Sequence, residues 1–551
     1  MGKKTYPFLL LIVLVFTFVA YFPVTYGFFQ HDEWATFGHY LSGGENLFSF
    51  FKPAFSHYAP LQNLLFYLYL SVFKLNFFWY ALFSIFAHLI VVYLCYIFFF
   101  KLFKNKLLAF FSSLLFAIGA SGHQATSWIA ADINTHGSVI FGLLAMITLF
   151  NSNFKKIWLS IFFLIISLLF KEITIAFFIL LPLMVYLFDK QKFRRNVLDY
   201  FKFVLVGFLF LTFRLSMIFF QRTHVEDRLV IETQSLLDIA ANIITFPSKI
   251  FAQSLIPTDQ LLSLARFISK TLPPQLTGLY GTTAFDVFTE QVTLQAINWG
   301  IFIVGLFAII FVVKKAKEGV MKKTAIFGFI FMILNSFIYV LSPGRFGSIP
   351  VVDSRNIYLS SIGTALFIVS TVYLLSKEKI TKLFLFVLPL LVLNIFWLEK
   401  ELTILADRGT ERKEILYQIK NTYPVLPQKA VFYMTSDKSF YGLPESEKIF
   451  PFETNLGYTI MVWYQPTEHF PKEFLDQSGF LYRLTDEGYK EQGDKGFGYF
   501  RNWDSFIQAI RSNSLGEDSA IAFSYNSNDK SIKDITYQVR KEIDVAVDKI
   551  K

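Results

Sequence analysis

Two adjacent carboxylates, Asp32 and Glu33, follow the first long apolar run of the chain, residues 6–22. Ionisable side chains at membrane depth cost about 3 kcal/mol each on insertion scales, so a pair at the mouth of a predicted membrane helix is a candidate functional site. The alternative is that both carboxylates are solvated residues just outside the membrane. This motif alone favours neither interpretation.

Three cationic residues have the chemistry to receive a phosphate group. Lys171, followed by Glu172, interrupts an otherwise apolar stretch, and Arg345 and Arg355 flank a later polar connection. The fork of donors on arginine fits phosphate geometry, whereas lysine acts as a point charge that Glu172 would hold in place. The alternatives are a local ion pair between Lys171 and Glu172, and arginines that extend to lipid headgroups.

The composition excludes a soluble globular protein. Of 551 residues, 54% are hydrophobic and 17% are charged, which is typical of a polytopic membrane protein. The formal net charge of +10 comes from short basic clusters between apolar runs, a pattern that reports membrane topology rather than nucleic-acid binding. The sequence has no Gly-rich phosphate loop and no Gly-x-Ser-x-Gly elbow, so it gives no support for ATP-driven transport or serine hydrolysis.

About eleven apolar runs are predicted to be membrane-spanning helices, each near the length that crosses a bilayer. They cover residues 6–23, 77–100, 107–121, 133–150, 157–170, 173–188, 202–220, 296–313, 324–341, 356–375 and 380–398. The first run could be mistaken for a signal peptide. Because no small-residue cleavage site follows it, we expect it to be retained as a membrane helix.

Basic clusters fall at alternate ends of these runs. They are Lys3/Lys4, Lys101/Lys104/Lys106, Lys155/Lys156, Lys190 to Arg195, Lys314 to Lys323 and Lys377 to Lys382. The positive-inside rule places all of them in the cytoplasm together with the N-terminus. The longer connections, including the one that contains Asp32 and Glu33, then face outward. We therefore expect an integral protein of the cell membrane whose chemistry takes place outside the cytoplasm.

The polar segments divide into surface helices and a separate domain. Residues Asp32 to Ser42 and Pro60 to Lys74 are predicted to be helices that lie along the membrane surface, and Ile239 to Ile256, interrupted by Pro247, is a further interfacial helix. The fold class is thus an all-α polytopic membrane domain, 1–399, followed by a small extracytoplasmic α/β domain, 400–551. In that domain Ala430 to Met434 and Tyr458 to Tyr464 are predicted strands, and Ile532 to Lys549 is a predicted helix.

Outward-facing histidines and a further carboxylate add candidate ligands. Asp132 could bind a sugar or an ion, or it could cap the helix that follows. The histidines on this side are His31, His39, His57, His123 and His136. Their spacings match no zinc motif, and the one cysteine, Cys95, lies inside an apolar run. A divalent cation held by Asp32, Glu33 and a histidine is one arrangement that these residue types allow.

Four segments carry a resemblance to a known family. They are Tyr58-Ala59-Pro60-Leu61 continuing to His88, Gly122-His123 continuing to Asn134, Lys171-Glu172, and Arg355-Asn356-Ile357-Tyr358 continuing to Gly363. With the acidic pair after the first span, they resemble the GT-C class of membrane glycosyltransferases. The likeness is strongest to the O-mannosyltransferase-like group that includes tetratricopeptide-carrying enzymes, although the repeat array is missing. It covers about residues 1–375, and it departs from the family pattern at Ala59, Gln124, Asp132 and Ser360.

The resemblance implies a polyprenyl-phosphate sugar as donor, a glycan, protein or lipid as acceptor, and no nucleic acid. Asp32 would be the general base, and Glu33 would orient Asp32 or the acceptor. Lys171, Arg355 and Arg345 would bind the donor phosphate. Further substrate contacts are expected from His31, Glu172, Asp132, His123 and Tyr358. Two alternatives remain open at this point: a transporter or flippase of lipid-linked glycans, in which the same charges line a path, and an inactive scaffold that uses its C-terminal domain for binding.

Overall fold

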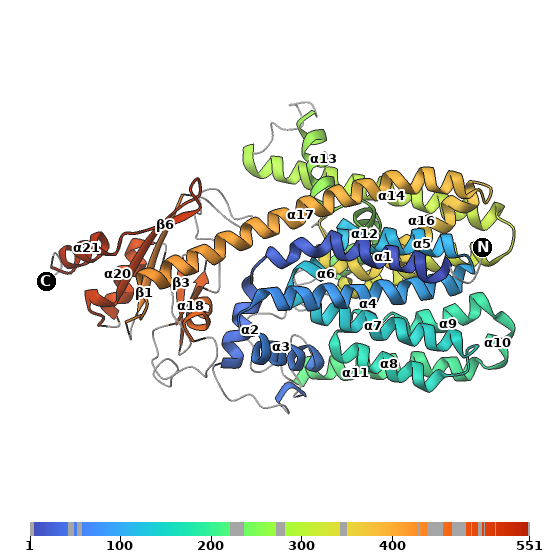
Figure 1. The fold of residues 1–551 in the computed structure, drawn as a ribbon, viewed down its shortest axis with the longest axis horizontal. Coiled ribbons are helices and arrows are strands. Elements are labelled where there is room, and N and C mark those ends of the chain that lie inside the picture. The colour runs from blue at the N-terminus through green and yellow to red at the C-terminus, as the bar shows by residue number, and fades with distance from the viewer. Residues whose placement is uncertain are drawn as a thin grey trace. The chain divides into compact units, whose positions relative to one another are not determined.

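The computed structural model is mostly helical (Figure 1). It describes residues 5–41, 49–51, 58–220, 236–271, 282–341, 350–427, 430–437, 456–465, 481–485, 488–493, 499–500, 502–512 and 514–548. The chain divides into two compact units. The bundle unit comprises Met1–Phe22, Phe51–Asn63 and Leu82–Leu402, and the second unit comprises Pro23–Phe50, Leu64–Ala81 and Thr403–Lys551.

A helix is present at each of the predicted membrane runs. Eight helices among the described residues are long and apolar enough to cross a membrane. Seven of them are α4 (Phe77–Phe103), α7 (Ile129–Asn151), α11 (Val197–Phe220), α14 (Thr282–Lys315), α15 (Val320–Ser336), α16 (Ser354–Leu375) and α17 (Ile380–Thr422), and the eighth is α1 (Thr5–Tyr21). The other predicted runs form shorter apolar helices, α5 (Lys106–Ala117), α8 (Ile157–Phe170) and α9 (Phe177–Phe188). That these three also cross the membrane stays a prediction.

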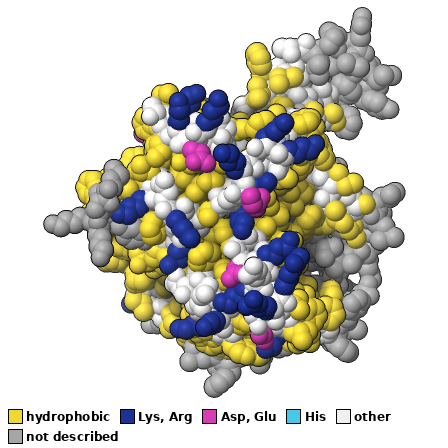
Figure 2. Space-filling model, turned by 90° about the vertical axis from the view of Figure 1, so that its right-hand side faces the viewer, with side chains coloured by type: hydrophobic (Ala, Val, Ile, Leu, Met, Phe, Trp, Pro, Cys, Tyr) yellow, Lys and Arg dark blue, Asp and Glu magenta, His cyan; other side chains and the backbone are white. Residues whose placement is uncertain are grey.

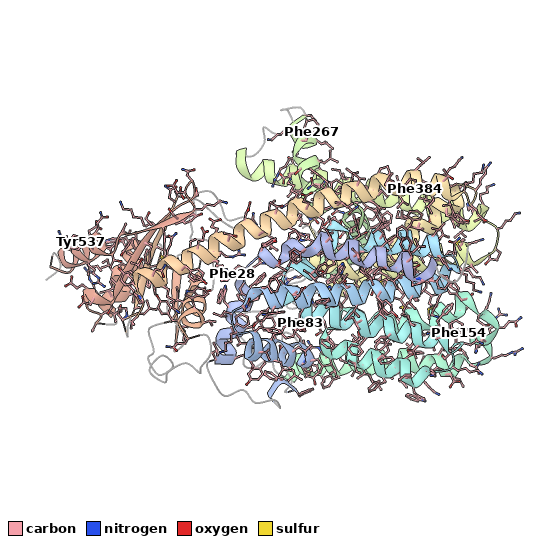
Figure 3. The ribbon with its side chains drawn as sticks, in the orientation of Figure 1. Phe28, Phe83, Phe154, Phe267, Phe384 and Tyr537 are labelled. Carbon is pink, nitrogen blue, oxygen red and sulfur yellow. The ribbon has the colours of Figure 1, made fainter. Side chains whose placement is uncertain are left out.

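Large apolar side chains lie on the outside of the bundle helices as well as between them. Phe83 on α4 and Phe384 on α17 are exposed, whereas Phe154 between α7 and α8 is buried (Figure 3). In a soluble protein such an apolar exterior would be unusual over so many helices. It is the surface expected of helices that contact lipid.

Basic side chains gather at one end of the bundle unit. Lys155 and Lys156 precede α8, and the short basic helix α10 (Lys190–Arg195) lies at the end where α1 begins (Figure 1). Figure 2 looks onto this end, where Lys and Arg side chains far outnumber Asp and Glu. The clustering agrees with the positive-inside pattern in the sequence. Which side of the membrane this end faces stays a prediction.

The segment predicted to be an interfacial helix interrupted by Pro247 has a different form. Helix α12 (Leu236–Leu255) continues through Pro247, and the chain bends by 102° just before α13 (Thr258–Thr271). The break therefore falls at Pro257, because a proline restricts the residue before it to extended conformations. The pair has the form of a broken span or a re-entrant loop.

Two glycines allow α15 and α16 to touch through their backbones. A Cβ atom on Gly328 would lie 2.8 Å from the carbonyl oxygen of Gly363, and one on Gly363 would lie 2.7 Å from the carbonyl oxygen of Gly328. Small residues at membrane helix interfaces permit this close approach. The contact fixes α16, whose first two turns carry Arg355 and Tyr358.

The second unit contains the polar C-terminal region. Its sheet has the order β4-β1-β5-β6, with β4 (Tyr499–Phe500), β1 (Val431–Ser436) and β5 (Ala520–Asn526) parallel and β6 (Ser531–Asp534) antiparallel to β5. A separate hairpin pairs β2 (Leu481–Thr485) with β3 (Gly488–Gly493). Helices α20 (Trp503–Ser512) and α21 (Thr536–Asp548) contribute Phe506, Ile510 and Ile543 to the core of the sheet.

Two elements predicted in this unit are confirmed, and one is wrong. A strand at 430–434 is confirmed by β1, and the helix expected after Asp32 is confirmed by α2 (His31–Leu41). The strand predicted at Tyr458 to Tyr464 is wrong, because these residues form α18 (Leu456–Tyr464), which packs against α2. Three consecutive residues of α18, from Ile460 to Val462, are buried, so a short apolar run did not distinguish a buried helix from a strand.

Two further boundaries differ from the predictions. Residues 531–534 form β6 rather than the start of the predicted C-terminal helix, which begins at Thr536. Helix α17 continues without interruption through residue 399, where the composition changes. The helix predicted from Pro60 is present as α3 (Pro60–Phe73), and its position along the membrane surface stays a prediction.

Candidate functional site

The turn that carries Lys171 is built by small residues of α7 and α8. Helix α8 ends at Phe170, and Lys171 is extended, with φ −169° and ψ 148°. The hydroxyl of Ser138 donates a hydrogen bond to the carbonyl oxygen of Lys171 over 3.0 Å, and Ser167 donates to the carbonyl oxygen of Ser138 over 2.6 Å. A Cβ atom on Gly137 would lie 2.3 Å from the ring of Phe170, so a glycine is required where the helices meet. These contacts fix the Lys171 backbone.

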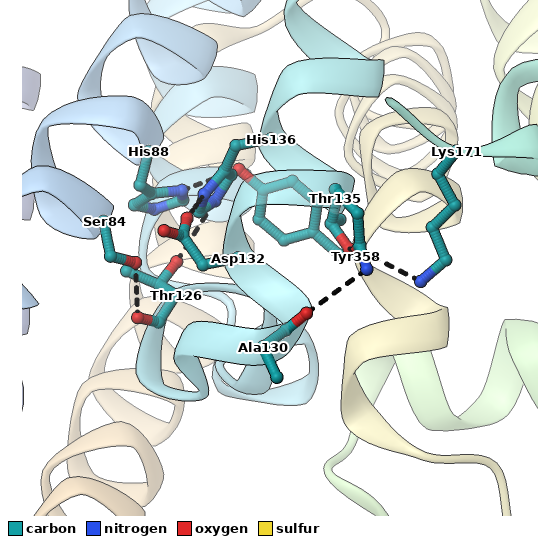
Figure 4. A network of polar contacts seen from close by, with 10 residues as sticks. Ser84, His88, Thr126, Ala130, Asp132, Thr135, His136, Lys171 and Tyr358 are labelled. Carbon is teal, nitrogen blue, oxygen red and sulfur yellow. Dashed lines mark hydrogen bonds and ion pairs between the residues drawn. The ribbon is translucent and has the colours of Figure 1, made fainter. Parts of the chain in front are cut away.

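The side chain of Lys171 is held by an amide relay. Its Nζ donates to Oδ1 of Asn134 over 3.2 Å, and Thr135 donates to the same oxygen over 3.0 Å (Figure 4). The amide nitrogen of Asn134 donates to Oε1 of Gln62 over 3.2 Å. Since both donors approach one end of the amide, its orientation is determined. The ammonium group of Lys171 therefore has a defined position at the opposite end of α8 from Lys156.

Glu172 pairs with a residue that the sequence analysis did not select. Its Oε1 lies 2.9 Å from the guanidinium group of Arg214 on α11, and the Arg214 side chain is largely buried. A single arginine inside an apolar run is the signal that could have identified it, because buried charges in membrane helices are rare and are usually paired. The pair adds a second basic residue beside the Lys171 turn.

Arg355 lies at the first turn of α16, against the connection between α5 and α7. Its guanidinium carbon lies 4.2 Å from the centroid of the Trp128 ring, and one of its terminal nitrogens lies 3.7 Å from Oδ2 of Asp353. The backbone N–H of Arg355 donates to Oε1 of Gln124 over 3.4 Å. Stacking on an aromatic face holds the guanidinium plane in one orientation. Arg345 lies outside the described residues.

A buried polar network lies inside the bundle unit, and Figure 4 shows it together with Lys171. Asp132 and His136, one helical turn apart on α7, are hydrogen-bonded through Oδ1 and Nδ1. Nε2 of His136 faces the hydroxyl of Thr126 at 3.4 Å. The sequence analysis named His136 only as one of the outward-facing histidines. Its spacing of four residues from Asp132 on a predicted helix was the signal that the two side chains would meet.

The second half of this network joins α4 to α16. His88 Nε2 lies 2.9 Å from the carbonyl oxygen of Ala117, which can only accept, so the proton is on Nε2. Nδ1 of His88 then accepts a hydrogen bond from the hydroxyl of Tyr358 over 2.7 Å. The rings of His136 and Tyr358 are also in contact, with centroids 5.1 Å apart. The bond fixes the first turn of α16, which also carries Arg355.

Burial changes what is expected of two predicted substrate ligands. Asp132 and Tyr358 are each 2% exposed and are bonded inside the network. Both are therefore better suited to position neighbouring groups than to contact a substrate directly. His123 is half-buried and shares a hydrogen bond with Ser127 at 3.1 Å, and burial lowers the pKa of His123 to about 4. It is neutral at pH 7.

The acidic pair belongs to the second unit. In α2, Oε2 of Glu33 accepts a hydrogen bond from the backbone N–H of Gln30 over 3.0 Å, the position of a capping glutamate at the start of a helix. Glu33 is 1% exposed, whereas Asp32 is exposed. Of the two carboxylates, Asp32 is thus the one that can reach a substrate. That Asp32 acts together with Lys171 or Arg355 stays a prediction, and the side chain of His31 lies outside the described part of the chain.

The four segments singled out in the sequence meet through these contacts. Gln62 belongs to the first, Asn134 and Trp128 to the second, Lys171 to the third and Arg355 to the fourth. Such an arrangement of fixed cations can stabilise an anion that forms in a reaction. Among the described residues, no group of three or more His, Cys, Asp and Glu side chains could hold a metal ion.

Comparison with known proteins adds no assignment. A scan against models of protein families gives no match, and a search of curated protein sequences finds none with significant similarity. The functional argument therefore depends on the residues and their geometry.

Proposed function

We propose that this protein is a membrane glycosyltransferase that moves a sugar from a polyprenyl-phosphate-linked donor to an acceptor hydroxyl at the outer face of the membrane. The observation that supports it is the contact set Gln62–Asn134–Lys171 and Trp128–Arg355, which joins distant segments into one cationic end of the bundle unit. This end is opposite to the basic clusters that predict the cytoplasmic side.

The cations suit a phosphate leaving group. Transfer breaks the bond between the anomeric carbon and the phosphate oxygen, and the negative charge then stays on the lipid phosphate. Lys171 supplies a compact charge, and Arg355 supplies a planar fork of donors. Because Asn134 and Trp128 already hold these groups, little reorganisation is needed when the charge develops. Arg214 neutralises Glu172, so the glutamate does not cancel the charge of Lys171.

Asp32 is the general base in this mechanism. A hydroxyl is a poor nucleophile near neutral pH, and a carboxylate that takes its proton contributes about 10²–10⁴ in rate. The acceptor oxygen forms the new bond to the anomeric carbon, and its proton passes to Asp32. Glu33 caps the start of α2 through its hydrogen bond with the backbone N–H of Gln30. It is therefore less suited than Asp32 to be the general base.

Transport of a lipid-linked glycan is the second candidate, and one observation favours it. The Asp132–His136 pair and the His88–Tyr358 bond are buried in helices of membrane length. Buried carboxylate–histidine chains in membrane proteins occur as proton relays in transporters. Against it, the Nε2–H of His88 ends on the carbonyl oxygen of Ala117, which cannot pass a proton onward.

The test is transfer of labelled sugar by the detergent-purified protein, where there is no membrane to cross. We expect transfer from a polyprenyl-phosphate sugar to acceptor, its loss in Asp32→Asn, and at least a tenfold weaker donor response in Lys171→Ala. Lys155→Ala, at the other end of α8, is the matched control and should be unchanged. Movement of the lipid-linked glycan across vesicles without any transfer in detergent would favour the transporter instead.

A further inference from the structure

The second unit contains a pocket whose lining includes none of the cations of the proposed site. Its volume is about 580 Å³, which lies within the range of small-ligand sites. The walls come from the segment that leads into α2, from the residues around the start of α4, from α17 and from α18.

Close backbone contact forms one side of this pocket. A Cβ atom on Gly409 of α17 would lie 2.6 Å from the backbone nitrogen of Phe28 and 2.9 Å from Cα of Gly27. Helix α17 therefore packs directly on the Gly27–Phe28 backbone, and the next residue, Thr410, lines the pocket. A larger residue at 409 would push these walls apart.

Aromatic rings form much of the remaining wall. Trp463 of α18 packs edge-on against Tyr417 of α17, with ring centroids 5.2 Å apart, and against Phe28 at 6.1 Å. Tyr417 is 48% exposed and Tyr26 is 62% exposed, and both line the pocket. These two tyrosines present accessible ring faces together with polar hydroxyl groups.

Polar groups of both charges complete the lining. Asn76, Lys413 and Glu414 are all exposed and line the pocket. Lys413 offers hydrogen-bond donors, Glu414 offers acceptors, and the amide of Asn76 offers both. Because the two charges cancel, the pocket has no excess charge to attract a phosphate.

We infer that this pocket binds a neutral carbohydrate chain, the sugar units of the acceptor. A pyranose ring has one face rich in C–H groups, which packs on an exposed tyrosine, and hydroxyl groups that both donate and accept. Tyr26 and Tyr417 provide the faces, and Asn76, Lys413 and Glu414 match the hydroxyls. An acyl chain could form no hydrogen bonds with Asn76, Lys413 or Glu414, whereas a sugar can. As the acceptor's site, the inference rests on the proposed glycosyltransferase function.

Binding is measured on the full-length protein in detergent with a panel of neutral oligosaccharides of two to six hexose units, alongside phosphorylated oligosaccharides. We expect selective binding of neutral chains, weakened at least tenfold in Tyr417→Ala. The control is Tyr537→Ala, which removes another exposed tyrosine of the same unit, on α21 away from the pocket lining (Figure 3). This control should bind like the unchanged protein.

A charge reversal tests the specificity independently of the ring. Glu414→Lys places two cations in the wall, so binding of neutral oligosaccharides should fall and binding of phosphorylated ones should appear. Unaltered affinity for neutral chains in both Tyr417→Ala and Glu414→Lys would overturn the inference. So would the absence of any bound saccharide.

The two proposals fail in different ways. Saccharide binding without sugar transfer by the unchanged protein would support the pocket and contradict the enzyme. Sugar transfer without saccharide binding, and with Tyr417→Ala fully active, would support the enzyme and contradict the pocket.

Discussion

Nζ of Lys171 donates a hydrogen bond to Oδ1 of Asn134 over 3.2 Å, across 37 residues of sequence. The bond joins the turn after α8 to the first turns of α7. A lysine side chain has four rotatable bonds and loses considerable rotamer freedom when it is fixed. The Asn134 amide, itself bonded to Gln62, is therefore what gives the charge of Lys171 a defined location.

Removing this amide should impair donor use. In Asn134→Ala, Lys171 keeps its charge but loses its partner, and a displacement of about 1 Å at a catalytic group can cost on the order of 10²-fold in rate. We expect transfer to fall by about 10- to 100-fold, with folding intact. Steady-state transfer kinetics with varied donor measure this. Asn151→Ala, at the exposed far end of α7, is the control, and equal activity of the two variants would show that Lys171 needs no such support.

The Glu172–Arg214 pair should contribute to the stability of the protein. Arg214→Ala leaves a partly buried carboxylate without its cation, and since breaking a fully buried pair costs about 3–5 kcal/mol, we expect a loss of about 1–3 kcal/mol here. The double variant Glu172→Gln/Arg214→Ala carries no unpaired charge, so it should recover part of that loss. Thermal unfolding in detergent, analysed as a double-mutant cycle, gives the coupling energy. Strictly additive losses would mean that the two residues do not interact.

The sequence predicted the helices and the candidate cations, but not their partners. Long apolar runs identify membrane helices because the bilayer fixes their length, so the runs from 77–100 and 356–375 were found with nearly correct bounds. Lys171 stood out as a charge in an apolar stretch, and Arg355 as an arginine that flanks a polar connection on the predicted outer side. Nothing in the sequence marks Asn134 and Trp128 as the partners of Lys171 and Arg355. These pairings depend on how helices far apart in the chain pack together.

Short elements gave the clearest errors. The run from Tyr458 to Tyr464 has residues that suit either a strand or a buried helix, and its packing against α2 decides the outcome. Pro247 was expected to interrupt a helix, yet α12 continues through it and bends only before α13. Neighbouring helices can satisfy the backbone groups that a proline frees in a membrane protein. The sequence around Pro247 does not indicate whether neighbouring helices supply these hydrogen bonds.

The bond between Tyr358 and His88 should act on Arg355 through α16. In Tyr358→Phe, Nδ1 of His88 loses its donor, and leaving a buried acceptor unsatisfied costs about 1–3 kcal/mol. Because Arg355 lies one turn before Tyr358, donor affinity should weaken by several-fold while the acceptor response stays the same. Tyr373→Phe, in the last turns of the same helix, is the control. A variant that unfolds more easily yet keeps the donor response of the unchanged protein would limit Tyr358 to a structural role.

His123 should make stability depend on pH below neutrality. Burial lowers the pKa of His123 to about 4, against about 6.5 in the unfolded chain, so between these values the unfolded state binds more protons. Stability should therefore be full above about pH 6.5 and fall as the pH drops towards 4, by at most about 3 kcal/mol. His123→Asn should flatten this part of the profile. Thermal unfolding of both proteins in detergent from pH 8 to pH 4.5 measures the difference, and parallel profiles would mean that His123 is protonated without cost in the folded protein.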